Sequence, residues 1–149
     1  MRLFRIEKEI YKEIFPPIEP LQFDGRWHTA GMWVVYCSQS IALAKLECLA
    51  SASFLPDGRI LKTIEVSNNV ILKEIQISDL PKGWNDIGSE RNLSHITLDA
   101  MKEGFLGMIV PSVLSPLENN VLLFPHHRDF YNEVKQIKIY NAYFDVQLK

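Results

Sequence analysis

Segments with strand character outnumber helical segments in this chain, and the two kinds do not alternate regularly. The residue pattern favours helices at 41–52 and 90–104, where apolar residues recur at helical spacing. Strands are expected at 34–36, 59–66, 70–77, 105–114, 119–124 and 137–148, the last of which supplies one or two. A doubly wound parallel sheet requires a helix between successive strands. The order of segments therefore predicts an α+β fold.

Two connections carry local signals. The polar residues 67–69 separate the strand-like segments 59–66 and 70–77. Serine and asparagine favour tight turns, so these two strands are expected to pair in a hairpin-like arrangement. Ser38 and Ser40 precede the first helical segment and are candidates for its N-cap.

Length and composition bound the class of protein. A chain of 149 residues is the size of one domain, so residues 1–149 are interpreted as a single unit. The net charge of −2 argues against a nucleic-acid binder that neutralises phosphates. Cys37 and Cys48 provide neither a disulfide framework nor metal-ligand spacing. The longest apolar segment, 105–114, is too short to span a bilayer, and no signal-peptide pattern is present. We expect a cytoplasmic protein that binds neither nucleic acid nor membrane directly.

Several common catalytic motifs are missing from the sequence. His126 and His127 are adjacent, and adjacent side chains point apart on a strand, so they predict no metal site. Ser112 lacks the Gly-x-Ser-x-Gly elbow of a hydrolase nucleophile. No glycine-rich phosphate loop occurs, which argues against the usual nucleotide-binding folds. We therefore expect neither a metal nor a bound cofactor.

The helical segment at 41–52 carries one lysine and one glutamate among apolar residues. Lys45 and Glu47 lie about 200° apart around a helix axis, so they cannot share a face. If Lys45 faces water, Glu47 points inward, where a carboxylate is costly unless it meets a cation, a hydrogen-bond donor or a ligand. The alternatives are a structural salt bridge and a helix rotated to expose Glu47.

Arg26 and Tyr36 are further candidates near this helix. Arg26 follows a glycine, which permits a tight turn, and its planar guanidinium suits carboxylate or phosphate oxygens. Arg26 is therefore the natural cationic partner for Glu47, although an ordinary solvated arginine explains the same pattern. Tyr36 ends an apolar strand, where it is either a ligand contact or a core residue with a wet hydroxyl.

Five ordered blocks resemble one known family. They read GRWHTAG, VVY, SIALAKLE, VPSVL and ENNVLLFPHHRDF, accompanied by Phe4-Arg5 near the start and by WNDIGSE in the middle of the chain. Together they are similar to the RES-domain family, which is named after an arginine, a glutamate and a serine. These residues match Arg26, Glu47 and Ser112, and the resemblance covers nearly the whole chain.

The resemblance implies a fold and a biological role. The expected fold is a single compact domain with a split β core flanked by helices, similar to ADP-ribosyltransferases. The expected role is the toxin component of a type II toxin–antitoxin system, which depletes NAD by cleaving the bond between nicotinamide and ribose. The partner implied is a cognate antitoxin with a helix-turn-helix DNA-binding domain.

The resemblance also implies roles for individual residues. Arg26, Glu47 and Ser112 are expected to be catalytic, and Arg5 and Tyr36 are expected to bind the substrate. NAD is then a substrate rather than a cofactor, and water or phosphate completes its cleavage. Two alternatives stay open: an ADP-ribosyltransferase that modifies a protein target, and a binding module without catalytic activity.

Overall fold

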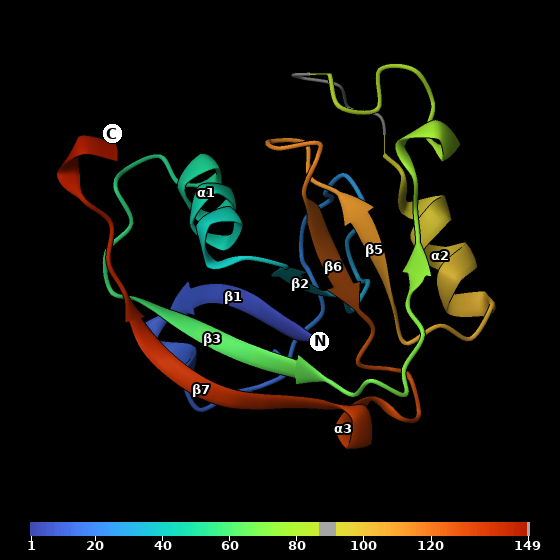
Figure 1. The fold of residues 1–149 in the computed structure, drawn as a ribbon, viewed down its shortest axis with the longest axis horizontal. Coiled ribbons are helices and arrows are strands. Elements are labelled where there is room, and N and C mark those ends of the chain that lie inside the picture. The colour runs from blue at the N-terminus through green and yellow to red at the C-terminus, as the bar shows by residue number, and fades with distance from the viewer. Residues whose placement is uncertain (87–91, 149) are drawn as a thin grey trace.

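The computed structural model of this chain describes residues 1–86 and 92–148. Within these ranges a seven-stranded sheet has the strand order β4-β5-β6-β2-β1-β3-β7 (Figure 1). The strands are β1 (Arg2–Lys8), β2 (Val35–Ser38), β3 (Arg59–Val66), β4 (Lys73–Glu74), β5 (Gly107–Pro111), β6 (Asn119–Leu123) and β7 (Val134–Ala142). The α-helices are α1 (Ile41–Ser51), α2 (Ser94–Lys102) and α3 (Phe130–Glu133). Short 3₁₀ turns are η1 (Glu9–Tyr11), η2 (Ile77–Asp79) and η3 (Val146–Leu148).

The sheet consists of two halves that meet at a narrow junction. In one half β3 lies between β1 and β7, and in the other β6 lies between β2 and β5. Strands β1 and β2 join the halves through a single registered pair, Phe4 and Ser38. Figure 1 shows that β1, β3 and β7 run across the direction of β5 and β6. The predicted α+β fold with a split β core is confirmed.

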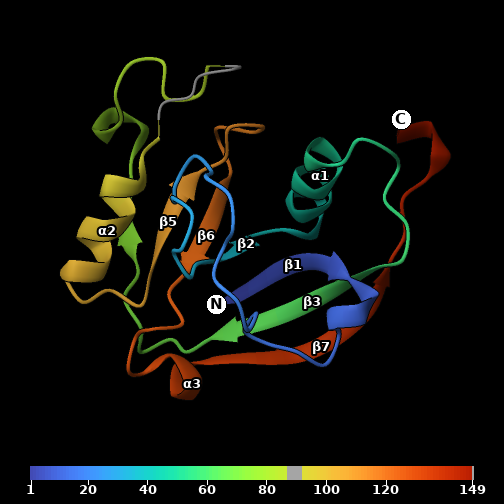
Figure 2. The ribbon, with the colours of Figure 1, turned by 180° about the vertical axis from the view of Figure 1, so that it is seen from behind.

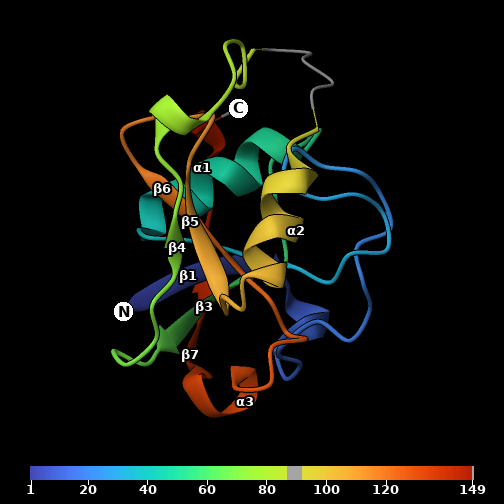
Figure 3. The same ribbon diagram turned by 90° about the vertical axis from the view of Figure 1, so that its right-hand side faces the viewer.

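Two helices cover different parts of this sheet. Helix α1 packs on β1 and β2 beside the junction, whereas α2 packs on β5 at the other side of the molecule (Figure 2). Figure 3 shows α2 alongside β5. Ser40 is the N-cap of α1, because its side chain accepts a hydrogen bond from the Leu43 amide at 3.1 Å. The predicted cap at Ser40 is confirmed, whereas Ser38, the other candidate, is the last residue of β2, which extends beyond the predicted strand 34–36.

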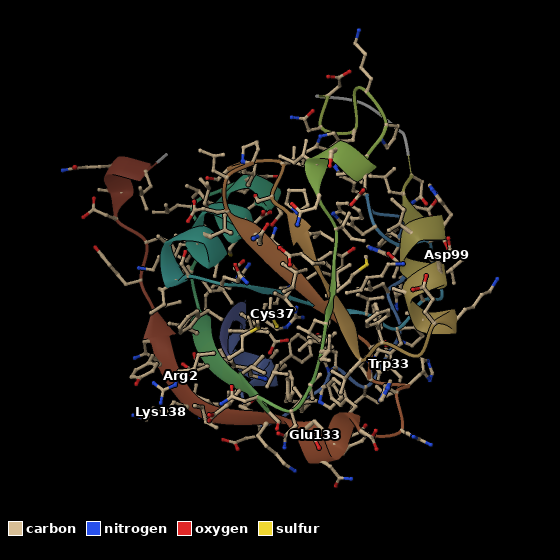
Figure 4. The ribbon with its side chains drawn as sticks, turned by 45° about the vertical axis from the view of Figure 1, so that its right-hand side comes forward. Arg2, Trp33, Cys37, Asp99, Glu133 and Lys138 are labelled. Carbon is tan, nitrogen blue, oxygen red and sulfur yellow. The ribbon has the colours of Figure 1, made fainter. Side chains whose placement is uncertain are left out.

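Two apolar clusters lie on opposite faces of the sheet. The first takes Leu3, Val35, Ile64 and Val121 from four different strands. The second includes Leu122 of β6, which follows Val121 and so points to the other face. Cys37 lies in the interior, whereas Asp99 and Lys138 lie at the periphery (Figure 4).

The prediction that 59–66 and 70–77 pair in a hairpin is wrong. Strand β3 has β1 and β7 as its neighbours, so neither of its edges is free for the following segment. Only Lys73 and Glu74 of that segment form a strand, and they pair in parallel with β5. Val70 and Leu72 pack against the first apolar cluster, so burial rather than strand pairing accounts for their apolar character.

The other predicted elements have shifted ends. The expected helix at 90–104 is α2, and residues 90 and 91 of that prediction lie outside the described ranges. The apolar segment 105–114 yields β5, which ends at Pro111. The C-terminal segment supplies one strand, β7, followed by η3. In the part of the chain described by the structure, no helix has the length and apolar character needed to cross a membrane.

Candidate functional site

A cavity of about 700 Å³ opens where β1 and β2 diverge and α1 passes beside them. Its wall includes three residues proposed from the sequence, Arg5, Tyr36 and Glu47. Asn120 of β6 and Arg59 of β3 also line it. Cavities of this size hold ligands as large as cofactors. The split in the sheet thus creates a cavity within the size range of small-molecule and cofactor sites.

Glu47 enters this cavity wall from the middle of α1. Lys45 points elsewhere: its ammonium donates a 3.0 Å hydrogen bond to the Tyr143 carbonyl and lies over the Phe144 ring. The expectation that Lys45 and Glu47 occupy different faces of the helix is confirmed. The Glu47 carboxylate is half-buried, which excludes the alternative of a helix rotated to expose it fully.

Two neutral side chains hold the Glu47 carboxylate. Ser112 Oγ donates to Glu47 Oε1 at 2.8 Å, and Asn120 Nδ2 donates to the same oxygen at 2.6 Å. Asn120 is itself fixed, because its Oδ1 accepts a 2.7 Å hydrogen bond from Ser38 Oγ. Ser112 is fully buried. Ser112 therefore reaches Glu47 rather than the open volume of the cavity.

No cation among the described residues neutralises Glu47. The ion pairs in these ranges join Arg5 and Lys62 to Glu7, Lys73 to Glu103, and Arg128 to Asp129. Within the same ranges, Glu47 Oε2 accepts no hydrogen bond, since both donors bind Oε1. Among the described residues the carboxylate thus has no cationic partner and one unoccupied oxygen, which is available to a cationic or hydroxyl-bearing ligand.

Arg26 lies apart from this carboxylate. Its guanidinium donates a hydrogen bond to the Trp84 carbonyl, and its own carbonyl accepts from the Leu93 amide just before α2. It is not among the residues that line the cavity. The Arg26–Glu47 pair left open by the sequence is therefore not formed in the described structure.

Arg5 spans the gap between β1 and β2. Its Nε lies 2.7 Å from Glu7 Oε1, and its Nη1 donates to the Tyr36 carbonyl at 2.9 Å. On the other side of Glu7, the buried Lys62 ammonium lies 2.7 Å from Oε2. Glu7 and Lys62 were not identified from the sequence. A lone lysine within the apolar strand 59–66 is the signal that could have revealed this buried ion pair.

Tyr36 lines the cavity, and its hydroxyl lies 2.5 Å from His28 Nδ1. Burial raises the pKa of the Tyr36 phenol well above its ordinary value, opposed in part by a backbone hydrogen bond from Trp27. Tyr36 is therefore a neutral hydroxyl at physiological pH. His28 was not predicted, although it lies in the GRWHTAG block.

The cysteine and histidine side chains show no arrangement for nucleophilic or metal-based catalysis in the described residues. Burial raises the pKa of the Cys37 thiol to about 12, against the smaller opposing effect of Arg5, so this cysteine is no thiolate nucleophile at neutral pH. His127 Nε2 lies 3.0 Å from the Gly104 carbonyl, and His126 packs edge-on against Trp33. Among the described residues, no group of three or more histidine, cysteine or acidic side chains is arranged to hold a metal ion.

Comparison with known proteins identifies the family. The RES domain model matches residues 2–145, which is nearly the whole chain. The chain therefore belongs to the RES-domain family, as the sequence blocks indicated.

Relatives and a solved structure agree with this assignment. The chain is 32% identical to Toxin Res of Photorhabdus laumondii, over 93% of this chain and 90% of that protein. It is 30% identical to Toxin Res of Yersinia enterocolitica, over 85% of each chain. It is 36% identical to the Prs ADP-ribosylating toxin of a Sphingobium species, over 70% of this chain and 68% of that one.

The fold also matches a crystallised protein. A chain of the M. tuberculosis MbcT–MbcA toxin–antitoxin complex superimposes with a TM-score of 0.67, covering 95% of this chain and 83% of that one. The two chains are 12% identical, so this likeness establishes a shared fold.

Proposed function

We propose that this protein is the toxin of a toxin–antitoxin pair and that it cleaves the bond between nicotinamide and ribose in NAD. The names of two relatives, both Toxin Res, support the toxin role. So does the fold shared with a chain of a toxin–antitoxin complex. NAD as the substrate is what the family resemblance implies. The side chains in the cavity wall are compatible with its cleavage.

The observation that carries the proposal is the Glu47 carboxylate in the wall of the cavity, with no protein cation beside it in the described residues. Cleavage of a nucleoside bond passes through a ribose with oxocarbenium character. A fixed negative charge stabilises such a transition state more than it stabilises the ground state. Glu47 is positioned for this role by Ser112 and Asn120.

The reaction needs no strong acid. Nicotinamide in NAD is already cationic, so when the bond from its ring nitrogen to the ribose carbon breaks, it leaves with the bonding electrons as a neutral molecule. Water then bonds to the ribose carbon and loses a proton, which yields ADP-ribose. Phosphate in place of water yields a sugar phosphate. Glu47 stabilises the ribose cation and is not itself consumed.

We assign other roles from position. Arg5 contacts the pyrophosphate, because its guanidinium lies in the cavity wall and such groups bind phosphate oxygens well. Tyr36 presents its ring to the nicotinamide. Ser112, which the family resemblance makes catalytic, acts here as a positioning residue for Glu47 because it is buried behind that side chain. Arg26 contributes to substrate binding only after it leaves the Trp84 carbonyl.

A second candidate is transfer of ADP-ribose to a protein. The relative named Prs ADP-ribosylating toxin favours it. Bond breaking at the nicotinamide is the same in both reactions, and a protein side chain replaces water as the acceptor. The same cavity therefore serves either chemistry.

Product analysis separates these possibilities. Purified protein is incubated with NAD in plain buffer, with added phosphate, and with bacterial lysate proteins. Mass spectrometry quantifies nicotinamide, ADP-ribose, its phosphorylated form and protein-bound ADP-ribose. Equal nicotinamide and ADP-ribose in plain buffer support hydrolysis, whereas dependence on phosphate or on lysate identifies phosphorolysis or protein modification. Absence of nicotinamide under all three conditions contradicts NAD cleavage and favours a binding module.

The partner we propose is a cognate antitoxin with a helix-turn-helix DNA-binding domain, as the family resemblance implies. Tyr11 and Ile18 line the cavity with a large part of their side chains exposed, so its rim offers apolar surface to a protein. An antitoxin bound over this rim blocks access of NAD to Glu47 in the cell that makes the toxin.

A further inference from the structure

His28 makes two directed contacts behind the cavity. Its Nδ1 lies 2.5 Å from the Tyr36 hydroxyl, and its Nε2 lies 2.8 Å from the Phe23 carbonyl. The His28 and Tyr36 rings also meet edge to face, with centroids 5.5 Å apart. His28 is buried, with 9% of its surface exposed. No role for this histidine follows from the proposed reaction.

The Phe23 carbonyl determines the tautomer of His28. A carbonyl oxygen can only accept a hydrogen bond, so in the neutral imidazole Nε2 carries the proton. Nδ1 is then an acceptor, and the Tyr36 hydroxyl donates its proton to it. One hydrogen bond from His28 to a backbone carbonyl thus fixes the direction of the Tyr36 hydroxyl and the orientation of its ring.

The loop around His28 is built to hold this ring in place. A Cβ atom at Gly25 would lie 2.3 Å from His28 Cε1, so only glycine leaves room for the imidazole there. The Gly25 amide donates to the His28 carbonyl at 2.9 Å. Asn92 Nδ2 donates to the carbonyls of both residues, at 2.7 and 2.9 Å. Gly25, the first glycine of the GRWHTAG block, therefore leaves the space that the His28 imidazole occupies.

We propose that His28 is a positioning residue, which holds the Tyr36 ring and hydroxyl in the orientation that the cavity needs for catalysis. The proposal rests on the proposed NAD-cleaving function, in which Tyr36 contacts the nicotinamide. His28 does not line the cavity and acts only through Tyr36.

Side-chain replacements that keep or remove the acceptor test this role. In His28→Asn the amide oxygen takes the approximate place of Nδ1, so Tyr36 retains its acceptor. In His28→Phe the ring volume stays but the acceptor is lost. Each change is made in the wild-type protein and in Tyr36→Phe, and kcat and KM for NAD are measured. The exposed His95 on α2 provides the control, His95→Asn.

The proposal predicts unequal losses. His28→Phe should lower kcat about 10-fold to 100-fold, the scale of a small misplacement at a reacting centre, with a smaller change in KM. His28→Asn should recover most of this loss, and in Tyr36→Phe neither change should have a further effect beyond about twofold. Equal losses in His28→Asn and His28→Phe, or full losses retained in Tyr36→Phe, would overturn the role.

A second measurement does not depend on turnover. Nitrogen NMR of wild-type protein with labelled histidine should show His28 protonated at Nε2 and not at Nδ1. A proton on Nδ1 contradicts the positioning mechanism even if NAD is cleaved. The Nε2 tautomer in a protein that cleaves no NAD supports the geometry of the pair and rejects the proposed function instead.

Discussion

Ser112 Oγ donates a 2.8 Å hydrogen bond to Glu47 Oε1, which joins the end of β5 to the middle of α1. Asn120 of β6 donates to the same oxygen. Ser112, directly after β5, and Asn120 of β6 therefore fix a carboxylate carried by helix α1 beside the junction. The position of Glu47 depends on packing between parts of the chain that are remote in sequence.

Ser112→Ala should lower both turnover and stability. The change removes a donor to Glu47 and an acceptor for the backbone amides of Leu114 and Ser115. We expect a loss of about 1–3 kcal/mol in the free energy of unfolding, because buried partners lose their hydrogen bonds. NAD turnover should fall on the order of 10-fold. Chemical denaturation and steady-state kinetics measure the two effects.

The matched control is Ser115→Ala, in the same turn. Ser115 Oγ donates to the exposed Glu118, whereas the hydrogen bonds to Glu47 among the described residues come from Ser112 and Asn120. Its removal should leave turnover within about twofold of wild type. An equal decrease in turnover in both variants would remove Ser112 from the positioning of Glu47.

Arg5→Lys and Arg26→Lys should separate the roles of the two arginines. A lysine ammonium is a single point charge, so it cannot reproduce the planar fork by which the Arg5 guanidinium contacts Glu7 and the Tyr36 carbonyl and would bind phosphate oxygens. Arg5→Lys is therefore expected to raise KM for NAD about 10-fold or more. Arg26→Lys should raise it less, since Arg26 binds the Trp84 carbonyl and does not line the cavity.

The exposed Arg128 serves as the control for both changes, as Arg128→Lys. A larger rise in KM for Arg26→Lys than for Arg5→Lys would assign the pyrophosphate to Arg26. Unchanged KM in both variants would mean that neither arginine binds this group.

Lys62→Met should destabilise the fold strongly. The buried ammonium lies 2.7 Å from Glu7 and donates to the carbonyls of Tyr11 and Ile14. Its removal leaves a buried carboxylate with one cation fewer, so unfolding should require about 3–5 kcal/mol less free energy. Lys62→Met combined with Glu7→Gln should recover part of this loss. Urea denaturation provides the measurement.

The exposed Lys138 on β7 provides the comparison for Lys62 (Figure 4). Lys138→Met should change stability by less than about 0.5 kcal/mol. A Lys62→Met protein as stable as the Lys138 variant would contradict a structural role for the buried ion pair.

Binding of the proposed antitoxin should protect the rim of the cavity. Hydrogen exchange of the toxin, alone and in complex, should slow in residues 11–19 and in the second half of α1, which contribute to the cavity wall. Amides of β4 and α2 should exchange at unchanged rates, because no residue of these elements lines the cavity. Protection confined to α2 and β4 would contradict direct occlusion of the cavity.

Local patterns in the sequence were sufficient for several elements. The run at 59–66 and the Ser40 cap predicted β3 and the start of α1, because strand character and capping depend on neighbouring residues. The predicted hairpin of β3 was wrong because strand pairing depends on residues that are remote in sequence. Strand β3 pairs with β1, at the N-terminal end of the chain, and with β7, near the C-terminal end, so its neighbours depend on residues remote in sequence.

In the candidate site, too, the features that depend on local sequence were predicted and those that depend on tertiary contacts were not. Helix geometry was enough to predict that Glu47 and Lys45 lie on different faces of α1. Its partner Asn120 is 73 positions away, and nothing in the local pattern links the two. The contact of His28 with Tyr36 has no signal in the residue pattern either. The lone lysine in 59–66 could have indicated a buried ion pair, but its partner Glu7 lies on another strand and is set by the tertiary fold.

NAD turnover by Glu47→Gln, with nicotinamide release as the readout, tests the central claim most directly. Glutamine keeps the volume and an oxygen that can accept from Ser112 and Asn120, but it removes the charge. We predict a melting temperature close to that of wild type and a loss of turnover on the order of 10²-fold or more. The exposed Glu65 on β3 gives the control, Glu65→Gln, which should retain wild-type turnover. A folded Glu47→Gln protein that releases nicotinamide at the wild-type rate would contradict the claim.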